Sequence, residues 1–100
     1  MKLGIHVKSD RHLEDVVGLT KAALSKGHEV IIFTMAEGVR LLENPIFTEL
    51  CKLKGVSMSF CDHNARGYGI NKTGIPQEVI CGSQFNNATM VSEADKVLVL

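Results

Sequence analysis

Short strand-like runs alternate with helical patterns along the whole chain, and this alternation restricts the fold more than any other feature. Residues 3–7 predict a first strand. Apolar side chains then recur at helical spacing over residues 13–24, and Gly27 stands where a left-handed turn ends such a helix. Residues 30–35 are nearly continuously apolar, which is typical of a strand covered on both faces. The chain therefore opens as a β–α–β unit.

The same alternation continues to the last residue. Asn44 and Pro45 form a cap followed by a first-turn proline, which predicts a helix that begins there and ends at Gly55. The later elements are expected as a strand at 56–60 with Cys61 at its end, a short helix at 62–68, a loop at 71–74, a strand at 78–81, a helix at 83–94 and a strand at 96–100.

Individual side chains carry expectations within these elements. Ser9 or Asp10 is expected to cap the helix at 13–24, because either side-chain oxygen can accept a bond from a free N–H group of the first turn. Apolar faces are expected at Ile46, Phe47, Leu50 and Leu53 in the second long helix, and at Phe85, Ala88 and Val91 in the helix at 83–94.

Strands joined by helices pair in parallel through right-handed crossovers as a strong default. We therefore expect an α/β fold of the flavodoxin-like kind, a three-layer α/β/α sandwich with about five mostly parallel strands. One hundred residues, 45% of them hydrophobic, suffice for a single domain over 1–100 and leave no room for a second.

The composition excludes several classes of partner. Eleven basic residues balance eleven acidic ones, so the chain has no electrostatic footprint for nucleic acid or for an anionic membrane. With no Trp and one Tyr, it also lacks a stacking platform for bases. The apolar runs are far shorter than the roughly 20 residues that span a bilayer. The first residues lack the features of a secretory signal, so we expect a cytoplasmic protein.

Cys61 is the most obvious nucleophile of the chain. Ligands and reactive groups in open parallel sheets gather beyond the carboxyl ends of the strands. That edge is expected to hold residues 8–9, 35–38, 61–64 and 82–84. If Asp62 begins a helix, the amide N–H groups and the positive end of the helix dipole favour the Cys61 thiolate. The Asp62 carboxylate opposes this unless it turns away, and His63 and Arg66 could offset its charge.

The alternative is a buried thiol without a role, since free Cys is among the most buried residue types. Cys51 and Cys81 are expected in the core or at a sheet edge, although either could be a resolving thiol for Cys61. An odd number of cysteines without a Cys-x-x-Cys pair predicts free thiols, a reducing compartment and no metal site. No Gly-rich phosphate loop follows the first strand, so no cofactor is expected, and His6 is expected to be a satisfied core residue.

Three segments that together span essentially the whole chain resemble the DsrE/DsrF family, which includes TusD-like sulfur-relay subunits. Residues 61–70 are similar to the family's pattern of Cys, two residues, Ser-Ala, two residues, Arg-Gly and an aliphatic residue. Residues 38–42 resemble its Gly-Val-x-Leu-Leu segment, and residues 93–99 resemble its final Ala-Asp-x-Val strand. Asn64 stands where the family usually has Ser, and Tyr68 where Arg is common.

The resemblance implies a DsrE-like sandwich that forms homo- or hetero-oligomers of trimeric or hexameric type. It also implies that Cys61 carries persulfide sulfur from a donor protein to an acceptor protein. In that role we expect Asp62, His63, Asn64 and Arg66 to bind the substrate or its anionic sulfur. Asn64 and the amides after Cys61 would orient or stabilise the sulfur, and Arg66 would add charge.

Three hypotheses follow for the function. The first is a cytoplasmic sulfur carrier or sulfurtransferase that uses Cys61. The second is a non-catalytic oligomeric subunit or small-ligand-binding module of the same fold. The third is a thiol redox sensor in which Cys51 or Cys81 forms a disulfide with Cys61 on mild oxidation.

Overall fold

The computed structural model describes residues 1–100, and its centre is a sheet of five parallel strands. The strands are β1 (Lys2–Val7), β2 (Glu29–Thr34), β3 (Val56–Cys61), β4 (Val79–Gly82) and β5 (Lys96–Val99). They lie side by side in the order β4-β3-β2-β1-β5, and every neighbouring pair is parallel. The sequence-based prediction of a five-stranded parallel sheet is therefore confirmed.

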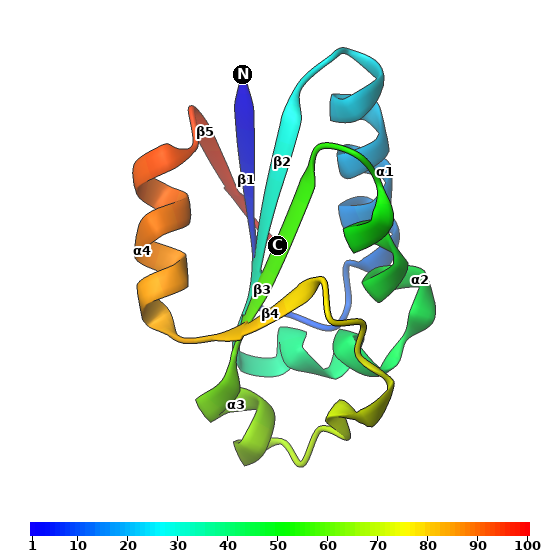
Figure 1. Ribbon diagram of the computed structural model, residues 1–100, viewed down its shortest axis with the longest axis vertical. Coiled ribbons are helices and arrows are strands. Elements are labelled where there is room, and N and C mark those ends of the chain that lie inside the picture. The colour runs from blue at the N-terminus through cyan, green and yellow to red at the C-terminus, as the bar shows by residue number, and fades with distance from the viewer.

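Helices cover the two faces of this sheet unequally (Figure 1). The α-helices are α1 (Leu13–Ser25), α2 (Pro45–Thr48), α3 (Asp62–Gly67) and α4 (Gln84–Glu93), and the 3-10 helices are η1 (Ala36–Glu43), η2 (Glu49–Lys52) and η3 (Lys72–Gly74). α1 and α2 lie on one face and α4 lies on the other, which confirms the three-layer sandwich. None of these helices is both long and apolar enough to cross a membrane.

The strand order explains the unequal cover. β1 to β4 follow one another in a single direction across the sheet, so right-handed crossovers keep their helices on one face. The connection from β4 returns to the far side of β1 and must cross the opposite face, where it forms α4. This order differs from the 2-1-3-4-5 order of flavodoxin within the same class of doubly wound sandwich.

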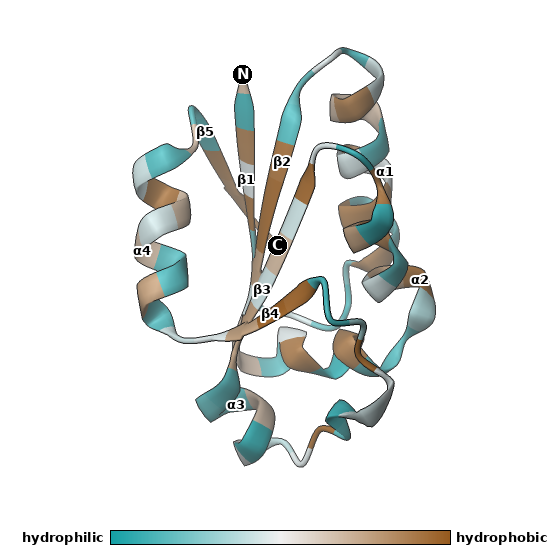
Figure 2. Cartoon of the chain, viewed as in Figure 1, coloured by the Kyte–Doolittle hydropathy of each residue, from teal (hydrophilic) through white to brown (hydrophobic).

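The larger core lies between the sheet and the layer that contains α1 and α2. One buried row crosses four strands, in which Ile5 pairs with Ile32, Ile32 with Met58, and Met58 with Val79. Phe47 from α2 is fully buried in the same cluster. Figure 2 shows apolar residues along β2, β3 and β4, while the polar residues lie mainly on the helices and loops.

The predicted apolar face of α4 is wrong. Phe85 is 76% exposed and Val91 is 54% exposed, and Ala88 is exposed as well. Met90 instead packs onto the sheet and is buried. Gly4 in β1 leaves room for this packing, because a Cβ at that position would crowd the Ala94 Cβ atom at 3.1 Å and the Met90 Cγ atom at 3.2 Å. The contact with β1 therefore sets the rotation of α4, and the sequence spacing within the helix does not.

The start of α1 also differs from its prediction, while its end does not. The helix follows His12, whose side chain makes no capping bond, so the predicted cap at Ser9 or Asp10 is wrong. The Ser9 hydroxyl oxygen instead accepts a bond from the Arg11 N–H group at 3.1 Å, inside the loop that precedes the helix. Gly27 has a φ of +82°, which confirms the left-handed turn after α1.

For the second long helix, the predicted cap is confirmed, but the prediction of one continuous α-helix is wrong. The side-chain oxygen of Asn44 accepts a bond from the Ile46 N–H group at 2.9 Å, as the cap prediction requires. The α-helical part ends after four residues and continues as the tighter η2. Phe47 and Leu50 face the core, whereas Ile46 lies about 100° further round the helix and is 63% exposed.

η1 has no counterpart among the predicted elements. It buries Val39, Leu41 and Leu42 against the sheet, although polar residues interrupt the apolar spacing on either side. Gly38 lies against the end of β1, where a Cβ would approach the Val7 carbonyl oxygen to 2.5 Å. A 3-10 segment that packs this closely depends on its neighbour, so its sequence pattern alone does not indicate a helix.

Candidate functional site

Cys61 is the last residue of β3 and also the N-cap residue of α3. Strand side chains alternate between the two faces, and Phe60 points into the larger core, so Cys61 points toward the α4 layer. There it packs with Phe33 and Met90 in a smaller core and is 4% exposed. The predicted place at the end of the third strand is confirmed, and the thiol is buried at that place.

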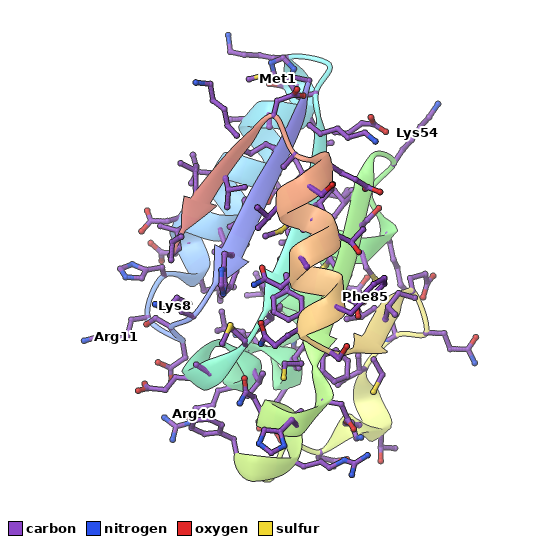
Figure 3. All side chains as sticks on the ribbon, turned by 90° about the vertical axis from the view of Figure 1, so that its left-hand side faces the viewer. Met1, Lys8, Arg11, Arg40, Lys54 and Phe85 are labelled. Carbon is purple, nitrogen blue, oxygen red and sulfur yellow. The ribbon has the colours of Figure 1, made fainter.

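A cavity of about 430 Å³ that is open to solvent has Cys61 in its lining. Its seven lining residues come from the carboxyl ends of three neighbouring strands and from the segments that follow them: Met35, Cys61, His63, Asn64, Ser83, Gln84 and Phe85. Figure 3 looks onto the face that α4 covers and shows Phe85 beside the first turn of that helix. The cavity thus borders a cysteine whose side chain is almost fully buried.

The predicted site residues divide into two groups. His63 and Asn64 line the cavity with Cys61, whereas Asp62 and Arg66 do not. The Asp62 carboxylate lies 2.6 Å from the Lys72 Nζ atom and 2.7 Å from an Arg66 guanidinium nitrogen. The Lys72 hydrogen bond, with help from Arg66, holds the pKa of Asp62 below its usual value. The carboxylate next to Cys61 is thus turned away and neutralised by two cations.

The other two thiols lie on the opposite face of the sheet from Cys61. Cys81 pairs with Phe60 in the strand register and shares its face, and its thiol contacts the Asp62 carboxylate. Cys51 belongs to the larger core. Burial raises the pKa of both thiols, with a further contribution from Asp62 at Cys81 and from Glu78 at Cys51.

This arrangement bears directly on the redox-sensor hypothesis. All three cysteines are free thiols. A disulfide requires the two Cβ atoms to approach to about 4 Å with compatible directions. Cys61 and each of the other cysteines point to opposite sides of the sheet, so such a bond would need the backbone to move. The geometry therefore gives no support to Cys51 or Cys81 as a resolving thiol for Cys61.

The first turn of α4 supplies polar groups at the rim of the cavity. The Ser83 hydroxyl accepts a bond from the Phe85 N–H group at 3.2 Å, and the Asn86 side chain accepts from the Ser83 N–H group at 2.9 Å. This reciprocal capping box leaves the Gln84 N–H group, the first of the helix, without an intrahelical acceptor. A negative charge in the cavity would therefore lie near the positive end of the helix dipole.

His6 lies under α4 on the same face of the sheet. Its ring meets the Phe33 ring edge to face, with 5.9 Å between the ring centres. Its Nε2 atom is buried without a hydrogen-bond partner, so the expectation of a satisfied core histidine is wrong. Burial, and to a lesser degree the charge of Lys8, lowers the pKa of His6.

Four residues of the cavity were missing from the predicted site: Met35, Ser83, Gln84 and Phe85. The strand-end rule already pointed to segments 35–38 and 82–84, so the first three had a usable signal in the sequence. Phe85 had none, because its helical spacing predicted a core position. No group of three or more His, Cys, Asp or Glu side chains lies close enough together to hold a metal ion.

The fold and the site define an α/β sandwich whose third strand ends in a cysteine at the base of an open cavity. Searches with the sequence find no matching family model and no matching curated protein. Among solved structures, the chain is similar to MTH1491 from Methanobacterium thermoautotrophicum, described as a protein of unknown function. The TM-score is 0.77 at 13% sequence identity, over 99% of this chain and 98% of MTH1491.

A second similar structure is the ychN protein from E. coli. The TM-score is 0.73 at 19% sequence identity, and the alignment covers 100% of both chains. At these identities the likeness shows the fold alone. The agreement over whole chains confirms the architecture. It gives no information on the role of Cys61, which is argued from the geometry around that residue.

Proposed function

We propose that the chain is a sulfur carrier of the DsrE/DsrF kind, in which Cys61 holds persulfide sulfur in transit between a donor protein and an acceptor protein. The observation that carries the proposal is that Cys61, at the end of β3, lines a cavity that is open to solvent. The resemblance of residues 61–70 to the family's cysteine motif supports it. The proposal places the chain in the cytoplasm, where reducing conditions keep its thiols free.

The transfer proceeds as two thiol exchanges. Cys61 releases its proton to solvent, and its thiolate attacks the outer sulfur of the donor persulfide. A sulfur–sulfur bond forms to Cys61 while the donor's own sulfur–sulfur bond breaks, and the donor leaves as a thiolate. The acceptor thiolate then attacks the same outer sulfur, and Cys61 leaves as a thiolate. Electrons balance within each exchange, so the transfer needs no oxidant or reductant.

The electrostatics of the site favour an anionic outer sulfur. Lys72 and Arg66 neutralise the nearest carboxylate, Asp62, outside the cavity. The first turn of α4, which carries the positive end of its helix dipole, contributes Gln84 and Phe85 to the cavity lining. In this proposal Arg66 acts by neutralising Asp62, and His63 and Asn64 line the cavity that the outer sulfur would occupy.

The test uses a low-molecular-weight persulfide, cysteine persulfide, as the donor. After incubation and removal of the reagent, intact-mass spectrometry should show one added sulfur atom on the wild-type chain. The Cys61→Ser variant should gain none. The Cys81→Ser variant is the matched control, because it removes an exposed thiol and should keep the adduct. An adduct that survives in Cys61→Ser, or none on the wild type, would overturn the proposal.

The burial of Cys61 favours one alternative, a non-catalytic subunit or small-ligand-binding module that uses the same cavity. A thiol that is 4% exposed can serve as a wall of the cavity without reacting. In that case Cys61→Ser keeps its partner or ligand binding unchanged. Binding measured for the wild type and Cys61→Ser side by side distinguishes the two functions, since only the carrier loses transfer.

We further propose that this chain assembles with copies of itself, as the trimers or hexamers of the resembling family do. Large apolar side chains lie exposed on α4 and on the two edge strands: Ile80, Phe85, Val91, Val97 and Val99. Monomers rarely leave such side chains uncovered over adjacent elements. The free edge of β5 also offers backbone groups that a strand of a second copy can pair with.

Val91→Lys tests this assembly, with Ile46→Lys as the matched control. Ile46 is equally apolar and exposed but lies on α2, away from the α4 face. Native mass spectrometry should show an oligomer for the wild type and Ile46→Lys, and a shift toward monomer for Val91→Lys. A monomeric wild type, or equal effects of both variants, would contradict the proposal.

A further inference from the structure

Asn64 uses its side-chain oxygen for a contact across the fold. This oxygen accepts a hydrogen bond from the Ala36 N–H group at 2.9 Å, and the bond is partly buried. The two residues are 28 positions apart. The bond ties the first turn of α3, directly after Cys61, to the first residue of η1.

Ala36 has a backbone conformation that alanine rarely adopts. Its φ is +50°, and it is the one non-glycine residue of the chain with a positive φ. The residues around it are anchored as well, since the Met35 N–H group bonds to the Val7 carbonyl at 2.9 Å and the Gly38 N–H group bonds to the Lys8 carbonyl at 3.2 Å. The Asn64 bond completes a turn that is held from both β1 and α3.

This turn carries Met35, which lines the cavity beside Cys61. The Met35 sulfur accepts a hydrogen bond from the Gln84 side-chain amide at 3.5 Å. Contacts therefore run from Asn64 through the turn at Ala36 to Met35 and on to the first residue of α4. Asn64, Met35 and Gln84 all line the cavity that Cys61 also lines.

We propose that Asn64 is a positioning residue: by holding Ala36 it keeps Met35 in place as a wall of the cavity and so limits access to the Cys61 sulfur. The consequence for sulfur transfer rests on the proposed function. The control of access itself does not, because any reagent for thiols reports it. Asn64 thereby sets how closely a donor must fit before its sulfur reaches Cys61.

The test measures the alkylation rate of Cys61 by iodoacetamide, followed by peptide mapping. Asn64→Ala should raise the rate about five-fold, the change in a local opening equilibrium expected for the loss of one hydrogen bond. Asn64→Asp keeps the accepting oxygen and should restore the wild-type rate. These rates are compared at the pH where they stop rising, which removes the effect of the added charge on ionisation of the thiol.

Two controls separate positioning from general loosening of the fold. Asn44→Ala removes a side-chain to backbone bond of the same 2.9 Å length at the start of α2. Asn44 follows η1 at the opposite end from Ala36 and does not line the cavity, so this variant should leave the Cys61 rate unchanged. Cys51, buried in the larger core, reports global opening within each sample. Hydrogen exchange at the Ala36 amide should accelerate in Asn64→Ala and stay slow in Asn64→Asp.

The inference is overturned if Asn64→Ala leaves the Cys61 rate within two-fold of the wild type, if Asn64→Asp behaves like Asn64→Ala, or if Cys51 accelerates equally. Should Asn64→Ala fail to fold, Met35→Ala removes the wall directly and must accelerate Cys61 alkylation; an unchanged rate overturns the inference. A wild type that takes up no sulfur refutes the carrier function and leaves these rates untouched, so the two failures are distinguishable.

Discussion

Replacing Ala36 by glycine should stabilise the protein, although it removes a side-chain atom. Ala36 has a φ of +50°, in the left-handed region where a Cβ crowds the backbone. Glycine has no Cβ and adopts this region readily. The Asn64 bond to the Ala36 N–H group is made by the backbone and survives the substitution. The variant therefore relieves strain and keeps the contact that holds the turn.

The magnitude follows from two opposing effects. The left-handed conformation costs an alanine roughly 1–2 kcal/mol. Glycine makes the unfolded chain more flexible and so lowers the free energy of unfolding by roughly 0.4–1 kcal/mol. With values near the middle of each range, the difference is a net stabilisation of about 0.5–1 kcal/mol. For a domain of this size that raises Tm by roughly 2–8 °C.

Urea denaturation and calorimetry of Ala36→Gly measure this gain, with an unchanged m-value as the sign of an unchanged folded state. Gly69→Ala is the reciprocal control. Gly69 has a φ of +66°, and a Cβ there would meet nothing within 4 Å, so the substitution adds backbone strain alone. It should lose about as much stability as Ala36→Gly gains. A destabilised Ala36→Gly beside a destabilised Gly69→Ala would refute the argument from strain.

Three more substitutions test separate contacts. Gly38→Ala places a Cβ 2.5 Å from a backbone oxygen of β1 and should lower the free energy of unfolding by about 2–4 kcal/mol in urea; a near-neutral variant contradicts this packing. Burial lowers the pKa of His6, so the folded state should lose stability as the pH falls from 6.5 toward the lower folded pKa, and His6→Phe should abolish that part of the loss in melts at pH 7.5 and 5. Burial is the main cause that raises the pKa of Cys81, and Asp62 raises it further. Asp62→Asn should therefore speed alkylation of Cys81 several-fold at pH 8. An equal change at Cys61 would indicate loosening of the fold instead.

The sequence predicts those features of the fold that depend on neighbours along the chain. Each strand has its own apolar pattern, so all five were found within two residues of their observed bounds. Gly27 and Asn44 act through the backbone of the next few residues, which makes their turn and cap predictable. Cys61 follows the same rule, because the end of an apolar strand marks the edge where cavities open.

Features that depend on distant contacts were missed. The rotation of α4 is set by Gly4, which lies near the other end of the chain, and the helical spacing alone favoured the wrong side. Asp62 turns away from Cys61 because Lys72, ten positions later, returns to bind it. Asn64 binds the turn at Ala36 rather than facing the cavity with its oxygen. A local pattern contains none of these partners.

The alternation of side chains along β3 determines on which face of the sheet Cys61 lies. Phe60 faces the larger core, so a cysteine one position earlier would lie beneath the layer of α1 and α2. At its actual position the thiol faces the side of the sheet that α4 alone covers, at the end where that helix begins. Gln84 and Phe85 of that helix line the same cavity as Cys61. The strand order that leaves this face thinly covered is thus the physical reason why a buried cysteine lies beside an open cavity.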